Sequence, residues 1–294
     1  MALDRKHWRS FLFVPAVNDR FIESATKRSA DVLLIDLEDS VGPDDKDRAR
    51  QRVSMIAAKF SQAERSVAVR INRQWHLAIK DIESSVCGAV NALVLPKVPD
   101  ASYVRYVDEV LSAFESQQGL ARGHTGLIVM VEDAEGLQNM SEIAAAGPRV
   151  CGLIVGAEDL AVSMQMAVSE DSLYVPNVLA VAACRKANIK PIGFVGSVAD
   201  FNDPADFRKK IARAAGLGFE AAFCIHPTQV QIVNEEFTPK AEAVSHAQAL
   251  IEEFERQMNV GRAACTFKGR MVDLPVVEQA RQLVRRFNAY QTAN

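Results

Sequence analysis

The chain has 294 residues, of which 49% are hydrophobic, so it can bury a large core as one α/β barrel or as two smaller domains. Its 34 basic and 37 acidic residues give a net charge of −3, and no basic block interleaves with aromatic residues, which argues against a nucleic-acid partner. No apolar stretch approaches the roughly 20 residues that span a bilayer, and the N-terminus lacks the apolar core of a signal peptide, so we expect a cytoplasmic protein with no membrane partner.

Short apolar runs alternate along the chain with segments of helical periodicity. The predicted strands are residues 10–16, 31–39, 67–72, 92–98, 127–133, 150–159, 190–197 and 221–227. Between them, segments such as DRFIESATKR and YVRYVDEVLSAFES place apolar residues three and four positions apart, which indicates helices. Eight apolar strands separated by helices predict a parallel sheet closed into a (β/α)8 TIM barrel. The alternative is an open doubly wound sheet, but no strand is followed by GxGxxG.

The last part of the chain follows the eighth predicted strand. We assign residues 1–236 to the barrel and residues 237–294 to a C-terminal helical extension. Within the extension, AEAVSHAQALIEEFERQM predicts a long helix, the stretch around GRAACTFKGR predicts an irregular link, and a last helix is expected from about Pro275. We find no sequence repeat, low-complexity tract or flexible linker.

Polar residues close the predicted strands, and the carboxyl ends of barrel strands meet on the rim where active sites are built. The set comprises Asp36, Glu38, Asp39, Arg70, Lys97, Glu132, Glu158, Asp159 and His226. Magnesium suits such an acidic rim, because it takes one or two protein carboxylates and completes its octahedron with water and substrate oxygens. We therefore expect Glu132, at the end of the apolar run LIVMV, to hold Mg²⁺, with Mn²⁺ as the alternative ion. The five scattered cysteines form no CxxC pair, which argues against zinc.

The same segments carry a resemblance to a known family. RSFLFVPA, LLIDLEDSVGPDDKDRAR, VRIN, LVLPKV, VEDAEG, GAEDLA, DFNDP, CIHPTQV, NEEFTP and GRMVDLP occur in the order found in the citrate lyase β-subunit-like family. This branch of the HpcH/HpaI aldolase superfamily includes malyl-CoA and citramalyl-CoA lyases. The resemblance implies a Mg²⁺-dependent carbon–carbon lyase that cleaves a short 3-hydroxyacyl-CoA into acetyl-CoA and an α-keto acid, pyruvate or glyoxylate. Two alternatives stay open: the citryl-thioester-cleaving β subunit of a multi-subunit citrate lyase, and a thioester-binding protein without turnover.

The resemblance also implies roles for individual residues. Glu132 and Asp159 match the family's metal-ligating carboxylates, and Arg70 matches the arginine that holds the substrate's carbonyl and carboxylate oxygens. Asp273 resembles the catalytic acid-base, which relatives deliver from the C-terminal extension to the active site of a neighbouring subunit. The positions that resemble substrate contacts are Phe13, Ala157, Glu158, Ile225 and His226. The resemblance further implies a homotrimer or a hexamer.

Several of these residues have a structural alternative. Asp36 and Glu38 are two positions apart on one strand face, which fits supporting contacts to Arg70 or to metal-bound water better than direct ligation. Asp273 precedes Leu274-Pro275 and is also suited to cap the last helix. Lys97 could form a Schiff base, as in metal-free aldolases. His226 before a proline is more typical of a structural hydrogen-bonding residue than of a base.

The chain departs from malyl-CoA lyases near the expected thioester site. Asn18 and Ser24 stand where those enzymes carry an arginine and a lysine. The basic residues left nearby for the CoA phosphates are Arg20, Lys27 and Arg28. Residues 168–176 are short compared with the insert that follows the sixth strand in some malyl-CoA lyases, which favours another hydroxyacyl thioester such as citramalyl-CoA.

Overall fold

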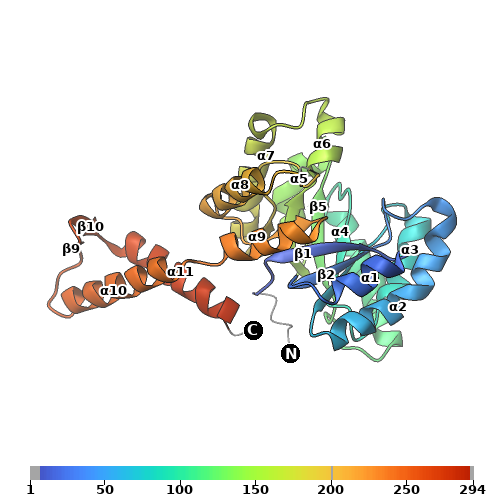
Figure 1. Ribbon diagram of the computed structural model, residues 1–294, viewed down its shortest axis with the longest axis horizontal. Coiled ribbons are helices and arrows are strands. Elements are labelled where there is room, and N and C mark those ends of the chain that lie inside the picture. Colours follow the sequence, from blue (N-terminus) through green and yellow to red (C-terminus); the bar gives the residue numbers. More distant parts are fainter. Residues whose placement is uncertain (1–6, 200, 292–294) are drawn as a thin grey trace. The chain divides into compact units, whose positions relative to one another are not determined.

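The computed structural model describes residues 7–199 and 201–291, and the chain divides into two compact units, Met1–Phe237 and Thr238–Asn294. The first unit contains eight parallel strands (Figure 1). They are β1 (Ser10–Pro15), β2 (Val32–Asp36), β3 (Ser66–Arg70), β4 (Ala92–Leu95), β5 (Gly126–Val131), β6 (Val150–Val155), β7 (Lys190–Ile192) and β8 (Ala222–Cys224).

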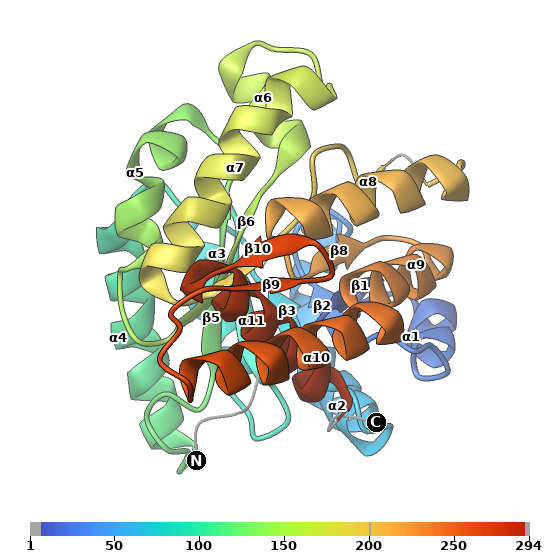
Figure 2. The same cartoon turned by 90° about the vertical axis from the view of Figure 1, so that its left-hand side faces the viewer.

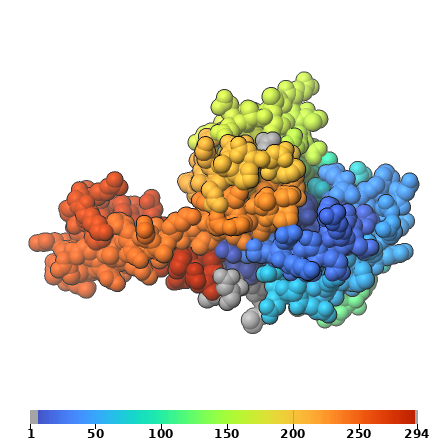
Figure 3. All heavy atoms as spheres, in the orientation of Figure 1, coloured from blue at the N-terminus to red at the C-terminus, as the bar shows by residue number. Residues whose placement is uncertain are grey.

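The strands pair in the order β7-β6-β5-β4-β3-β2-β1-β8, so the first strand lies beside the last. A parallel bridge between Ile192 and Ala221 links the end of β7 to the residue before β8 and brings the two ends of the sheet together. In the space-filling view, the blue N-terminal surface lies against the orange surface of the segment that follows β8 (Figure 3). The predicted (β/α)8 barrel is confirmed.

Helices connect the strands and cover the outside of the barrel. They are α1 (Asp19–Ala25), the 3₁₀ helix η1 (Pro43–Asp45), α2 (Lys46–Gln62), α3 (Trp75–Ser85), α4 (Ala101–Gln117), α5 (Ala134–Ala144), α6 (Ala157–Met164), α7 (Glu170–Ala187), α8 (Pro204–Leu217) and α9 (Pro227–Phe237). Helices α5 and α7 lie side by side, as do α8 and α9 (Figure 2). Because α6 begins at Ala157, Glu158 and Asp159 lie in the first turn of a helix and not at the end of the predicted sixth strand.

Alternation along the strands separates two apolar layers. In β1, Phe11 belongs to the cluster that fills the barrel, whereas Leu12 and Val14 pack in the larger cluster between strands and helices. Successive strand residues point to opposite faces, so both faces of each strand must be apolar below the rim. Full burial of one such side chain contributes about 1.5–3 kcal/mol, and these two layers hold the strand ends rigidly in place.

The second unit contains α10 (Ala241–Met258), β9 (Cys265–Phe267), β10 (Arg270–Val272) and α11 (Leu274–Gln291). The stretch expected to be an irregular link is instead an antiparallel hairpin, with Arg270 opposite Phe267. Lys268 and Gly269 both have positive φ, which is the geometry of a two-residue type I′ turn. Apolar residues of both helices and the hairpin form a core within the unit. Across residues 7–199 and 201–291, no helix is long and apolar enough to cross a membrane.

Candidate active site

The polar residues of the rim continue the inward-facing rows of the strands. Asp36, Arg70 and Glu132 each stand two residues after a side chain of the cluster that fills the barrel, and therefore on the same strand face. All three are buried. Asp36 is also the register partner of Arg70 on the adjacent parallel strand, which brings the two side chains together at one level.

Arg70 is anchored by three carboxylates, those of Asp36, Glu38 and Asp39. Its Nε and Nη2 donate to the two oxygens of Asp36 at 2.7 and 2.8 Å. Its Nη1 lies 2.9 Å from Oε2 of Glu38 and 3.4 Å from Oδ2 of the more exposed Asp39. On another side, the guanidinium carbon lies 4.8 Å from the ring centroid of Phe13, a cation–π contact. The bidentate pair with Asp36 fixes the plane of the guanidinium in the rim.

Glu132 has one oxygen bound and the other against a glycine. Its Oε2 accepts a hydrogen bond of 2.7 Å from the backbone N–H of Lys97. Near its Oε1 lies Gly156, the residue after β6, where an added Cβ would come within 2.4 Å of that oxygen. Only glycine leaves room for the carboxylate there.

Lys97 connects the two acidic sides of the rim. Its ammonium nitrogen lies 3.2 Å from Oδ1 of Asp159 and 3.9 Å from Oε1 of Glu38. Asp159 holds the pKa of Lys97 above its ordinary value, although partial burial alone would lower it. Because a Schiff-base lysine needs a depressed pKa, this environment does not fit the metal-free alternative.

Burial and charge set the protonation of the rim carboxyls. Burial raises the pKa of Glu132 to about 7, with the charge of Asp159 adding to the rise. Burial likewise raises the pKa of Glu38 to about 7, against the opposing charge of Arg70. The pKa of Asp36 is lowered, because the hydrogen bonds and charge of Arg70 outweigh its burial. The positive charge near Glu132 and Glu38 therefore does not offset the effect of their burial, whereas Arg70 more than offsets the effect of burial on Asp36.

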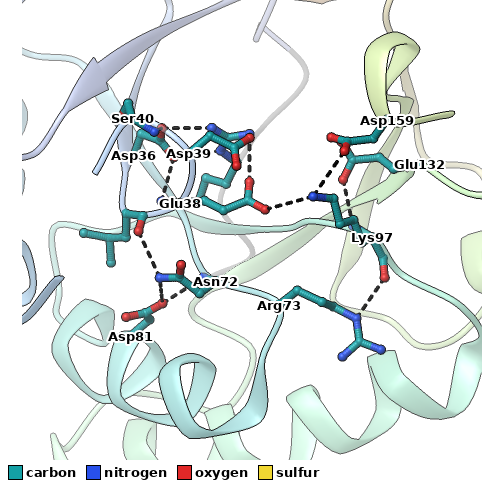
Figure 4. Close-up of polar contacts among 12 residues, drawn as sticks. Asp36, Glu38, Asp39, Ser40, Asn72, Arg73, Asp81, Lys97, Glu132 and Asp159 are labelled. Carbon is teal, nitrogen blue, oxygen red and sulfur yellow. Dashed lines mark hydrogen bonds and ion pairs between the residues drawn. The ribbon is translucent and has the colours of Figure 1, made fainter. Parts of the chain in front are cut away.

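A buried network behind the rim holds the loop that follows β2. Asp81 accepts hydrogen bonds from the backbone and side-chain nitrogens of Asn72 at 2.8 and 2.7 Å, and Asn72 donates at 2.9 Å to the carbonyl oxygen of Leu37. The ammonium of Lys46 donates at 2.7 Å to the carbonyl oxygens of both Leu37 and Glu38. These bonds fix the backbone that carries Glu38 beside Arg70. Figure 4 shows the contact between Asn72 and Asp81.

A cavity of about 800 Å³ opens at this rim. Of the residues predicted to form the site, its walls contain Phe13, Asp36, Arg70, Glu132, Ala157, Glu158, Asp159, Ile225 and His226. Arg20 of α1 and Arg28, which follows that helix, also line it, whereas Lys27 and Glu38 do not. Asp273 belongs to the second unit, where its Oδ1 accepts from the Val276 backbone N–H at 3.4 Å at the start of α11.

The remaining predicted wall residues have local structural partners. Nδ1 of His226 lies 2.8 Å from the hydroxyl of Thr228, and its ring stacks on Phe201 with centroids 5.4 Å apart. The backbone N–H groups of Ile225 and His226 both donate to the side chain of Gln229. The structure thus shows a hydrogen-bonded turn with an exposed histidine.

Glu132 and Asp159 are two cavity carboxylates that could hold a metal ion. In the part of the chain that the structure describes, no group of three or more His, Cys, Asp or Glu side chains is placed to hold one. The charge of Asp159 contributes to the raised pKa of Glu132, and the two side chains lie next to each other in the close-up (Figure 4). Such a pair suits magnesium, which commonly binds through one or two carboxylates.

Sequence reasoning did not identify Gly156, Asn72 or Asp81 as parts of the site. The glycine of GAED was visible, but its contact with Glu132 joins two different strands. Ser197, which lies outside the predicted set of site residues, donates a hydrogen bond to the carboxylate of Glu158. The contacts of Gly156 with Glu132, of Asn72 with Leu37 and of Ser197 with Glu158 join positions at least 24 residues apart. No local sequence pattern predicts such contacts.

Comparison with known proteins gives one consistent result. The model of the family described as HpcH/HpaI aldolase/citrate lyase matches residues 9–227. The L-malyl-CoA/beta-methylmalyl-CoA lyase of Rhodobacter capsulatus is 33% identical, over 94% of this chain and 93% of that protein. The citrate lyase subunit beta of Escherichia coli K12 is 31% identical, over 95% and 92%. The protein CitE of Mycobacterium tuberculosis, solved with magnesium, acetoacetate and coenzyme A, is 26% identical with a TM-score of 0.74, over 95% of this chain and 98% of that one.

Proposed function

We propose that this chain, a lyase that belongs to the HpcH/HpaI aldolase/citrate lyase family, cleaves a short 3-hydroxyacyl-CoA into acetyl-CoA and an α-keto acid in a Mg²⁺-dependent reaction. The observation that carries the proposal is the cavity of about 800 Å³ whose walls bring together Arg70, Glu132 and Asp159. A citramalyl-CoA or malyl-CoA type of substrate fits a site that combines an arginine suited to carboxylates with two acids suited to a metal ion.

Glu132 and Asp159 are the residues that would hold the metal ion, Mg²⁺ or Mn²⁺. Their fit rests on the electrostatics: a buried carboxyl whose pKa is raised to about 7 beside a second acid is stabilised by an adjacent dication. When bound, the ion supplies Lewis-acid polarisation of the substrate oxygen that becomes the keto group. Asp36 and Glu38 take a supporting role, because their contacts orient Arg70.

The chain's own groups can bind and orient the acid end of the substrate. Arg70 is held in place along the edge bound to Asp36, while its long contact with the exposed Asp39 can give way to substrate oxygens. The N-terminus of α6 has no side-chain cap, so backbone N–H groups near Ala157 and Glu158 are suited to a carboxylate. Phe13, Ile225 and His226 complete the wall along the thioester.

A positioned acid must protonate the enolate carbon as the carbon–carbon bond breaks, and in condensation the same group removes a methyl proton of acetyl-CoA. We assign this step to Asp273, delivered by the second unit, residues 238–294, to the active site of a neighbouring subunit in a homotrimer or hexamer. Asp273 stands at the exact start of a helix and beside a short hairpin, which would present its carboxyl from a defined backbone.

The test is cleavage of (S)-citramalyl-CoA and (S)-malyl-CoA with magnesium and with a chelator. We expect release of pyruvate or glyoxylate with acetyl-CoA only when the metal is present, and faster with citramalyl-CoA. The similarity to citrate lyase subunit beta favours a second candidate, cleavage of a citryl thioester on a carrier protein. Metal-dependent cleavage of citryl carrier protein without cleavage of either CoA ester would select that candidate; no cleavage of any of the three would refute both.

Gly156→Ala tests the geometry of the metal site directly. The new Cβ would lie within 2.8 Å of Oε1, Cγ and Cδ of Glu132, so the carboxylate must leave its position. We expect magnesium affinity, measured by calorimetry, to fall at least about tenfold while the barrel stays folded. Gly216→Ala in α8, where an added Cβ meets nothing within 4 Å, is the matched control and should bind magnesium as the wild type does. Unchanged magnesium affinity in Gly156→Ala would show that Glu132 does not hold the metal.

A further inference from the structure

Lys97 has a backbone conformation that is unusual for its residue type. Its φ is +49°, in the left-handed region, which costs a residue with a Cβ about 1 kcal/mol. Both of its peptide groups are bonded there: its N–H donates to Glu132 at 2.7 Å, and its carbonyl oxygen accepts from Nε of Arg73 at 2.9 Å. Arg73 is itself steadied by Tyr103, whose ring centroid lies 4.1 Å from the guanidinium carbon. Glycine would adopt this backbone more easily. The backbone conformation therefore does not explain why a lysine stands here, so the reason lies in its side chain.

That side chain places a positive charge on the metal-site acids. The ammonium of Lys97 touches Asp159 at 3.2 Å, and Glu38 offers a second carboxylate 3.9 Å away (Figure 4). Asp159 is at the same time one of the two residues proposed to hold magnesium. An ammonium in contact with a ligand oxygen lies close to where the metal would bind. It also neutralises part of the negative charge that attracts the metal. Lys97 and the ion are both cations attracted to the same carboxylate, so each weakens the binding of the other at Asp159.

We propose that Lys97 is a placeholder cation: it balances the acidic pair before the metal arrives, competes with magnesium for Asp159, and moves onto Glu38 when the metal binds. This inference rests on the proposed function, since it needs a metal at Glu132 and Asp159. The short distance to Glu38 lets the displaced ammonium keep a carboxylate partner. Lys97 acts as a positioning residue that sets how tightly the site takes its ion.

The test is magnesium binding by calorimetry to Lys97→Gly. Glycine removes the ammonium and keeps the left-handed backbone, so the hydrogen bond to Glu132 survives. We expect magnesium to bind about tenfold more tightly or better, and the metal to raise the melting temperature more than in the wild type. Lys97→Arg, which retains the charge, should bind as the wild type does, and so should Lys80→Met, which removes an exposed lysine of α3.

Glu38→Gln supplies the second arm of the experiment. Without this carboxylate, the ammonium has only Asp159, so magnesium affinity should fall further in the wild-type background than in the Lys97→Gly background. Equal losses in the two backgrounds, or unchanged or weaker metal binding in Lys97→Gly, would overturn the placeholder role while leaving the metal site in place. A wild-type protein that binds no magnesium would instead refute the proposed function, and the placeholder role with it.

Discussion

Replacing Glu132 with glutamine is expected to abolish metal-dependent cleavage while the barrel remains folded. Glutamine has the same shape, and its carbonyl oxygen can still accept the hydrogen bond from the Lys97 backbone. It cannot supply the negative charge that a hard cation requires. We expect turnover to fall by roughly a thousandfold or more and magnesium affinity by at least about a hundredfold. Glu135→Gln, an exposed neighbour on α5, is the control and should retain both.

When no metal is added, the same substitution should raise the free energy of unfolding, although it lowers activity. Burial raises the pKa of Glu132 from 4.5 to about 7, so the folded chain disfavours the ionised carboxylate. This penalty is absent below about pH 4.5, grows as the pH rises to about 7, and stays constant above that. The glutamine variant lacks the penalty, so its free energy of unfolding at pH 8 should exceed that of the wild type by at most about 3 kcal/mol.

Saturating magnesium should reverse that order, because only the wild type gains stability from the bound ion. The reversal is tested by measuring the free energy of unfolding of both proteins with denaturant at pH 4 and pH 8, with and without magnesium. If the glutamine variant is instead less stable than the wild type at pH 8 without metal, the Glu132 carboxylate stabilises the folded chain by itself. The predicted penalty of its ionisation would then be wrong.

The barrel could be predicted because each strand is recognisable in the sequence as a short apolar run. An apolar run such as LIVMV is long enough for one strand and is buried on both faces. Because side chains alternate between the two faces of a strand, the next side chain that points into the barrel is that of Glu132. The same argument places Asp36 and Arg70 on the rim. The exact ends were harder to predict: GLIVGAED reads as a continuous strand, but α6 begins at Ala157, directly after Gly156. The rim was therefore predicted as a set of residues and not as a geometry.

The features that tune the site depend on contacts between distant segments. The left-handed backbone of Lys97 is fixed by Glu132 and Arg73, which lie 35 and 24 positions away. The role of Gly156 depends on Glu132, which directly follows the adjacent strand β5. By contrast, the hairpin of the second unit had a local signal, the Lys268-Gly269 pair, which is short and was read as part of an irregular link.

Asp273→Asn should separate the two roles that the sequence suggests for this residue. Asparagine caps a helix as well as aspartate does, so α11 should keep its start and the protein its stability. Asparagine cannot transfer the proton, so turnover should fall by roughly a hundredfold to ten-thousandfold with magnesium affinity unchanged. If Asp273 only caps the helix, Asp273→Asn should instead turn over as the wild type does, and only Asp273→Ala should lose stability, by about 1 kcal/mol.

A mixture of two inactive variants tests which subunit supplies the acid. Glu132→Gln spoils the barrel site and leaves Asp273, whereas Asp273→Asn spoils the acid and leaves the barrel site. When the two chains are co-expressed and assemble together, a site built from the barrel of the Asp273→Asn chain and the acid of the Glu132→Gln chain contains every required group. We expect such mixed oligomers to regain a substantial fraction of wild-type turnover, although each variant alone is inactive. If both groups acted within one chain, every site would lack one of them, and the mixed oligomers would stay as inactive as their parents.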